Sequence, residues 1–192
     1  MSSAAVFNII SAAVGILGLT SIVIAWLQLR DSTRWNRRNA AFTYFPSAPE
    51  LSDVEKGLED VVRFFTRPQT QPLTDLEAKA LHGAELTAEE IQLLKRASDL
   101  HVPDSELAFR FRDAGRHLKH YLSVLERYSL AINSGVVDRG VANRLFHSKF
   151  LTHFTKAEAY IRYAQRKADG AYRELEEVVN TWSRRRLSNG AA

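Results

Sequence analysis

Residues 104–135 read DSELAFRFRDAGRHLKHYLSVLERYSLAINSG and contain the longest regular pattern in the chain. Apolar side chains recur at every seventh residue, with a second set at the four-residue offset, which is the a/d seam of a packed helix. Pro103, with Asp104 or Ser105 as the cap, starts the pattern, and Gly135 stops it. We therefore predict one long helix here. Its seam consists of Leu107, Phe111, Ala114, Leu118, Tyr121, Leu125, Tyr128 and Ile132.

A second helix should follow directly, beginning at Val136, Val137 and Asp138. Because so short a connection joins them, the two helices should be antiparallel neighbours and form a long helical hairpin. Gly170 then separates a final helix from Ala171 to about Arg186. The apolar residues of the second helix again fall on one face and are Val141, Leu145, Phe150, Phe154, Ala157, Ile161 and Ala164.

Shorter helices are predicted upstream of the hairpin. Three segments, Ser52–Glu55, Thr74–Glu77 and Thr87–Glu90, have the spacing of a capping box, in which a hydroxyl residue precedes a Glu by three positions. Residues 66–73 hold two prolines and no periodic pattern, which is typical of a loop. No segment shows the alternation of a strand. The expected fold class is therefore all-α, a bundle of four to six helices containing the long hairpin.

Residues 5–29, AVFNIISAAVGILGLTSIVIAWLQL, contain no charged residue. A bilayer needs about 20 helical residues, so this run is long enough to be a single transmembrane helix. It is too long for the apolar core of a cleaved signal peptide, and no Lys or Arg precedes it. We expect a transmembrane anchor over residues 1–29, a basic juxtamembrane segment over 30–49 and the helical bundle over 50–192.

The charges beside this run predict its orientation. Arg30, Arg34, Arg37 and Arg38 follow it, against Asp31 alone. The positive-inside rule then places the N-terminus outside and the bundle in the cytoplasm, at the inner (cell) membrane. The four arginines should lie at the membrane surface, where an anionic leaflet attracts them. The absence of Cys agrees with a reducing compartment.

Small and polar residues form one stripe on the expected span. Asn8, Ser11, Gly15 and Gly18 recur at three- and four-residue spacing, so a second helix could approach closely along them. Such residues are also common in membrane helices that do not associate. We interpret the stripe as a helix-packing face and expect a homo-oligomer.

Familiar catalytic and metal-binding motifs are absent. The chain has no Gly-rich phosphate loop, no GxSxG, no HExxH and no Cys. His117, His120, His147 and His153 do not form a strong metal-ligand set. We therefore predict no metal and no cofactor.

Arg112 and His117 are the candidate catalytic residues. An Arg and a His separated by four residues, with a polar residue after the Arg, resemble the motif of HEPN ribonucleases. In that family the His acts as acid or base on the RNA 2′-hydroxyl and the Arg steadies the phosphate. On one straight helix the two side chains point about 140° apart. A shared site would need a break in the helix or a second subunit.

The same helix carries several basic residues that could face RNA, namely Arg110, Arg112, Arg116, Lys119 and His120. Asp113 and Glu126 interrupt this series. A solvated helix face therefore explains it better than a nucleic-acid surface, and RNA is not an expected partner.

The stretch from Tyr121 to Trp182 resembles a bacterial family catalogued as domain of unknown function 4760. The resemblance rests on Leu125-Glu126, Ala131-Ile132 and Gly135-Val136-Val137-Asp138, followed by aromatic and apolar positions. It implies an N-terminal membrane anchor with a helical domain and no assigned activity. The layout also looks like that of HEPN-like membrane accessory proteins of phage-defence and CRISPR systems. The later matching positions are Phe150, Phe154, Tyr160, Ile161, Tyr172, Leu175 and Trp182.

These observations predict a membrane-anchored helical protein that mediates interaction and oligomerisation. Its expected role is that of an accessory or effector in antiviral defence, one that could assemble its spans into a pore. Its expected partners are the lipid bilayer, further copies of itself and a soluble protein. Two alternatives remain open: a membrane-tethered HEPN-like ribonuclease, and a passive tether for a soluble partner.

Overall fold

The computed structural model describes residues 3–43, 71–98 and 102–189, and it describes side chains within residues 21–43, 71–98 and 102–184. These ranges contain six α-helices and no β-strand. The all-α prediction is therefore confirmed for the described part of the chain. The helices are α1 (Ser3–Thr43), α3 (Asp75–Leu81), α4 (Ala88–Ala97), α5 (Asp104–Asn133), α6 (Arg139–Lys167) and α7 (Arg173–Asn189).

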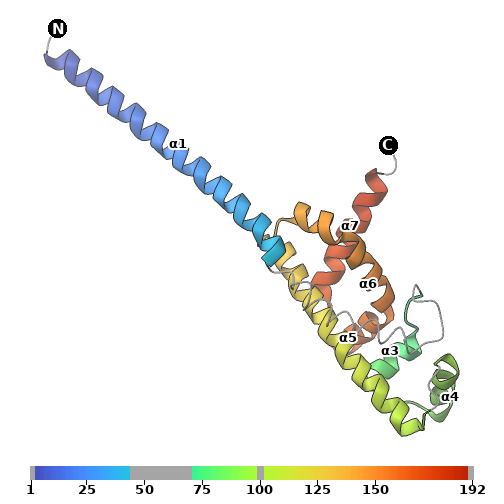
Figure 1. Cartoon of the computed structure of the whole chain (residues 1–192). Helices are drawn as coiled ribbons and strands as arrows, with labels where there is room; N and C mark the ends of the chain where they lie inside the picture. The colour runs from blue at the N-terminus through green and yellow to red at the C-terminus, as the bar shows by residue number, and fades with distance from the viewer. Residues whose placement is uncertain (1–2, 44–70, 99–101, 190–192) are drawn as a thin grey trace.

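The helices fall into two unlike parts. Helix α1 projects away from the rest as one long rod, whereas α3 to α7 gather into a bundle built along α5 (Figure 1). The end of α5 nearest α1 leads through a tight turn into α6, and α4 lies at the opposite end of the bundle (Figure 1).

Helix α5 confirms the predicted seam. All eight seam residues are buried, each with 3 % or less of its surface exposed. Gly135 ends the helix as expected, with a φ of +74° that glycine adopts without strain. The start differs from the prediction: Pro103 occupies the cap position without a side-chain hydrogen bond, and Asp104 forms an ion pair with Lys95 instead. Asp104 therefore links α5 to α4 instead of capping α5.

Helix α6 agrees with its predicted apolar stripe only in part. Phe150, Ala157 and Ile161 are buried, but Leu145 is 46 % exposed. The helix begins at Arg139 rather than at Val136, because the Asp138 carboxylate caps its first turn. Helices α5 and α6 are in contact, yet α5 packs more extensively against α7 and α3. The first turns of α6 consequently have an outward face that periodicity alone did not reveal.

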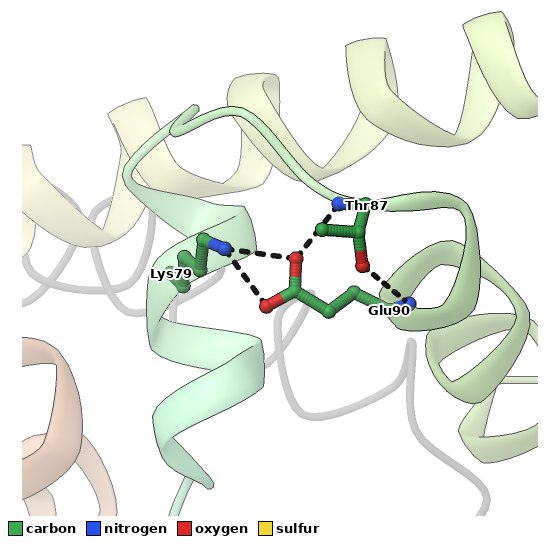
Figure 2. A network of polar contacts seen from close by, with 3 residues as sticks. All are labelled: Lys79, Thr87 and Glu90. Atoms are coloured by element: carbon green, nitrogen blue, oxygen red, sulfur yellow. Dashed lines mark hydrogen bonds and ion pairs between the residues drawn. The ribbon is translucent and has the colours of Figure 1, made fainter.

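Two of the predicted capping boxes are present and position α3 and α4. In the first box, Thr74 accepts from the Glu77 backbone N–H at 3.3 Å, and Glu77 accepts from the Thr74 N–H at 2.7 Å. Figure 2 shows the second box, in which Glu90 accepts from the Thr87 N–H and also from the Lys79 ammonium, both at 2.8 Å. Glu90 therefore caps α4 and links it to α3. The third expected box, Ser52–Glu55, lies outside the described residues.

Helices α3 and α5 approach each other at Gly115. A β-carbon at this position would lie 1.8 Å from the Leu81 carbonyl oxygen, which is far inside contact distance. The neighbouring Tyr160 hydroxyl donates to the Gly115 carbonyl at 3.3 Å. Glycine is thus required here by backbone packing, although it lies in the interior of a helix, where it normally costs stability.

Helix α1 continues without a break across residue 30, where the anchor was expected to give way to the juxtamembrane segment. Among the residues that the structure describes, we find no helix with both the length and the apolar character needed to cross a membrane. The residues expected to pack one span against another, Asn8, Ser11, Gly15 and Gly18, lie on α1 outside the described side chains.

Candidate functional site: the junction of α1 with the bundle

Helix α1 is exposed along most of its described length and meets the bundle near its C-terminal end. Every side chain from residue 21 to residue 39 is exposed, including large apolar ones such as Ile22, Trp26 and Leu29. Further along, Ala40 is partly buried and Ala41 is completely buried against the bundle. The bundle therefore holds α1 by its C-terminal turns.

The first fixing contact comes from α5. The Tyr128 hydroxyl donates a hydrogen bond to the Ala41 carbonyl at 3.0 Å. The last four carbonyls of a helix have no partner within the helix, so this bond satisfies a group that α1 cannot satisfy itself. Phe146 and Phe150 pack beside the Tyr128 ring, with centroids 5.5 and 5.9 Å away. Burial raises the pKa of the Tyr128 hydroxyl, which therefore stays protonated and remains a donor.

The second fixing contact comes from the turn between α5 and α6. The Asp138 backbone N–H donates to the Arg37 carbonyl at 3.0 Å. The Asp138 carboxylate meanwhile accepts from the N–H groups of Gly140 and Val141, both at 2.9 Å. One residue thus starts α6 and holds α1. Because Arg37 and Ala41 are about one helical turn apart, the two contacts fix the direction of α1 as well as its position.

Glu126 caps the start of α7, as Asp138 caps the start of α6. Its carboxylate accepts from the backbone N–H groups of Glu174 and Leu175, at 3.1 and 2.8 Å. Burial raises the pKa of Glu126, while these two hydrogen bonds oppose that rise. The residue before α7, Tyr172, has a φ of +57°, which only a well-supported turn tolerates. Glu126 and Asp138, both quoted for the family resemblance, are therefore helix caps in this structure.

The structure does not bring Arg112 and His117 together within one chain. Both lie on α5, which is unbroken between them, so the local break that a shared site would require is not present. Both side chains are exposed, and Arg112 lies over Gly83, where a β-carbon would be 3.3 Å from its Nε atom. Ala114 and Gly115, between them, serve helix packing.

The basic residues of α5 are partly neutralised on their own helix. Arg110 pairs with Glu106 at 2.6 Å, and Arg116 pairs with Asp113 at 2.5 Å. Lys119 and His120 are exposed. This arrangement fits the solvated face that the interrupted charge pattern favoured.

The two histidines of α6, His147 and His153, contact aromatic side chains. His153 hydrogen-bonds the Tyr121 hydroxyl, and the His147 ring lies 6.0 Å from that of Trp182. No cluster of three or more His, Cys, Asp or Glu side chains suited to a metal ion occurs among the described residues.

Sequence reasoning missed His82, which closes α3. Its ring stacks on Tyr160 and Tyr163, with centroids 3.9 and 4.7 Å away, and its Nε2 lies 3.0 Å from the Tyr160 carbonyl. Burial lowers the pKa of His82, the Tyr160 hydrogen bond opposes this, and the charge of Lys119 lowers it further. The only local signal was its position before Gly83, which says nothing of partners 78 residues away.

The four arginines expected at the membrane surface are all exposed on α1. The Arg30 guanidinium lies over the Trp26 ring, 5.5 Å from its centroid. Arg34, Arg37 and Arg38 follow on the same helix, and the Arg37 carbonyl is the group that Asp138 binds. The four arginines therefore lie on the part of α1 that leads up to and includes its contact with the bundle.

A family model described as Domain of unknown function (DUF4760) matches residues 15–182. This range includes α5, α6 and both capping residues, Glu126 and Asp138. No curated protein and no solved structure matches the chain, and nothing found supports the likeness to HEPN-like proteins.

Proposed function

Since this chain belongs to the DUF4760 family, whose description records no activity, we propose its function from its own residues: it is a membrane-anchored helical protein that mediates interaction and oligomerisation. In this proposal the uncharged run 5–29 is a single-pass span, and the bundle is the module that makes contacts. The proposal concerns a binding role rather than catalysis.

One observation carries the proposal. The uncharged run ends in residues 21–29, and each of these side chains is exposed on α1, which the bundle contacts further along, at Arg37, Ala40 and Ala41. Exposed fractions of 66 % for Ile22, 57 % for Trp26 and 68 % for Leu29 leave a continuous apolar surface in water. Soluble monomers rarely keep such a surface uncovered, so lipid or another protein should cover it.

The charges that follow the run support the proposed orientation. Arg30, Arg34, Arg37 and Arg38 favour a cytoplasmic bundle by the positive-inside rule. The bundle would then lie on the inner side of the cell membrane, with its arginines against the headgroups. Trp26 would lie at the level of the headgroups, where an indole ring is favourable.

The junction explains how contacts on the bundle could act on the span. Because α1 is fixed at Arg37 and Ala41, a bundle that binds another bundle also sets the relative directions of two α1 helices. Such pairing would bring the faces formed by Asn8, Ser11, Gly15 and Gly18 together. Assembly of several spans could then form a pore.

Membrane association is tested on the full chain in cells. We expect the protein to remain in the membrane pellet after a carbonate wash, which strips peripheral proteins. Release into the supernatant would contradict the anchor.

Assembly is tested by measuring the particle mass of the full chain in mild detergent. We expect an oligomer whose mass falls in Gly15→Leu, because a bulky side chain would separate helices that meet at this face. Ala13→Leu is the matched control, since residue 13 lies about 160° around the helix from residue 15. An unchanged mass in Gly15→Leu would exclude this face as the interface. A monomer that leaves vesicles impermeable to dye would exclude the pore and favour a passive tether.

We propose in addition that the assembly serves as an accessory or effector in antiviral defence. The support for this role is the layout alone, an anchor followed by a helical domain, which is an argument by analogy. Cells that express the chain should survive phage challenge better than cells that express Gly15→Leu. Equal survival would contradict the role.

A further inference from the structure

The end of the bundle nearest α1 carries exposed apolar and basic side chains together. Leu130, Val136 and Leu145 are 53 %, 44 % and 46 % exposed. Arg139 and Arg144, on the first turns of α6, are also exposed and have no ion-pair partner among the described residues. We call these five residues the proximal surface.

The two ends of the bundle differ in charge. The segment 127–149, which includes the proximal surface, has four basic residues and one acidic residue, a net charge of +3. The acidic residue is Asp138, whose carboxylate is occupied in capping α6. The segment 84–113 has four basic and seven acidic residues, a net charge of −3. This segment includes α4 and the start of α5, at the end of the bundle away from α1 (Figure 1).

The junction places the basic end close to the expected membrane. The Asp138 N–H binds the Arg37 carbonyl, so the turn before α6 lies at the level of Arg37. Arg37 is about 12 Å along the helix from Leu29, the last residue of the uncharged run. The headgroup layer takes up about 5–8 Å of this distance. The remaining gap is shorter than the screening length of about 8 Å at physiological salt.

We infer that the proximal surface rests on the anionic headgroups of the membrane that holds α1. This inference rests on the proposed anchor, because α1 supplies the nearness. The arginine guanidinium groups suit lipid phosphates, to which they can donate paired hydrogen bonds. The exposed Val136 and Leu145 side chains would lose contact with water where this end meets the headgroup layer. The acidic end would then point away from the membrane, toward the cytoplasm.

The test uses the full chain with one cysteine, since the chain has none of its own. Val136→Cys reports on the proximal surface, and Leu93→Cys, at a residue 53 % exposed on α4, is the matched control. Each variant is labelled with a polarity-sensitive dye and reconstituted into vesicles. The vesicles contain phosphatidylcholine alone or an equal mixture with phosphatidylglycerol.

We expect the dye at residue 136 to shift to the blue on the anionic vesicles, and high salt to reverse the shift. The dye at residue 93 should not respond. Arg139→Gln should lower the ratio of docked to undocked bundles about fivefold, which corresponds to the attraction of one charge near such a surface. Arg96→Gln on α4 should leave this ratio unchanged.

The outcomes separate this inference from the anchor. Co-flotation with both vesicle types but identical dye responses at residues 136 and 93 would overturn the inference and leave the anchor standing. Co-flotation with the anionic vesicles alone would support the surface contact and overturn the anchor. Failure to float with either would overturn both.

Discussion

Helices α1 and α5 are the two longest of the described helices, and they differ in how much of their surface packs against the rest of the chain. Helix α5 buries twelve residues along its whole length. In α1, among residues 21–43, only Ala41 is buried. Most helical stability in proteins comes from packing an apolar face, and α5 has its own bundle for this purpose. Helix α1 has apolar residues without such a partner inside the chain, so its environment must supply one.

The largest effect on stability is expected when a buried tryptophan is removed, and removal of an exposed tryptophan is the control. Trp182 is 1 % exposed and packs on Phe150, with ring centroids 5.3 Å apart, whereas Trp35 on α1 is 68 % exposed. Trp182→Ala should lower the free energy of unfolding of the bundle by about 3–5 kcal/mol. Trp35→Ala should change it by less than about 0.5 kcal/mol. Denaturant unfolding followed by circular dichroism measures both, and equal losses would contradict the division into two parts.

The next test concerns the close approach of α5 and α3. Gly115→Ala would add a methyl group 1.8 Å from the Leu81 carbonyl oxygen, so the two helices must separate. We expect a loss of at least about 2 kcal/mol despite the better helix propensity of Ala. Gly140→Ala is the matched control, because a β-carbon there would lie 3.3 Å from its nearest neighbour, an Asp138 carboxylate oxygen. A Gly115→Ala protein as stable as this control would refute the packing role.

A smaller effect is expected at the junction that joins the two parts. Tyr128→Phe keeps the ring among Phe146 and Phe150 but removes the hydrogen bond to the Ala41 carbonyl. The cost should be about 0.5–1.5 kcal/mol. Hydrogen exchange should therefore speed up in the last turns of α1 more than in α7. A uniform change across the bundle would mean that Tyr128 stabilises the core without holding α1.

Local patterns predicted the parts of this fold that depend on neighbours in the sequence. The α5 seam, two capping boxes and the Gly135 stop all follow from spacings of at most one or two helical turns. The outward face of early α6 was missed because periodicity shows that a face is apolar, not that something covers it. The junction joins Tyr128 to Ala41 across 87 residues and uses a backbone carbonyl, which no side-chain pattern can reveal.

The candidate site was harder to predict than the fold for the same reason. Arg112 and His117 were selected by their spacing, yet their helix is continuous, and Gly115 between them packs against α3. The sequence identified Glu126 and Asp138 only as residues that match the family pattern. Their roles as helix caps depend on where the N–H groups of α7 and α6 lie. Sequence spacing proposes which residues share a helix face, whereas tertiary structure decides what that face meets.

The smallest expected effect concerns pH and the bundle alone. His82 lies between Tyr160 and Tyr163, and burial lowers its pKa below the ordinary 6.5. The unfolded chain therefore binds this proton more readily than the folded chain. Stability should be complete above pH 6.5 and fall as the pH drops through the folded-state pKa. Because the His82 ring is only partly buried, we expect its protonation to lower the free energy of unfolding by less than about 1 kcal/mol.

His82→Gln isolates this contribution, since the glutamine amide can still donate to the Tyr160 carbonyl but does not titrate. Unfolding midpoints of the two proteins, measured in parallel from neutral to mildly acidic pH, should diverge below pH 6.5, with the variant losing less. The other five histidines titrate in both proteins and cancel in the difference. Parallel curves would show that the stacked ring is accessible enough to accept its proton without disturbing the end of α3. The acid sensitivity of the bundle would then have to arise elsewhere.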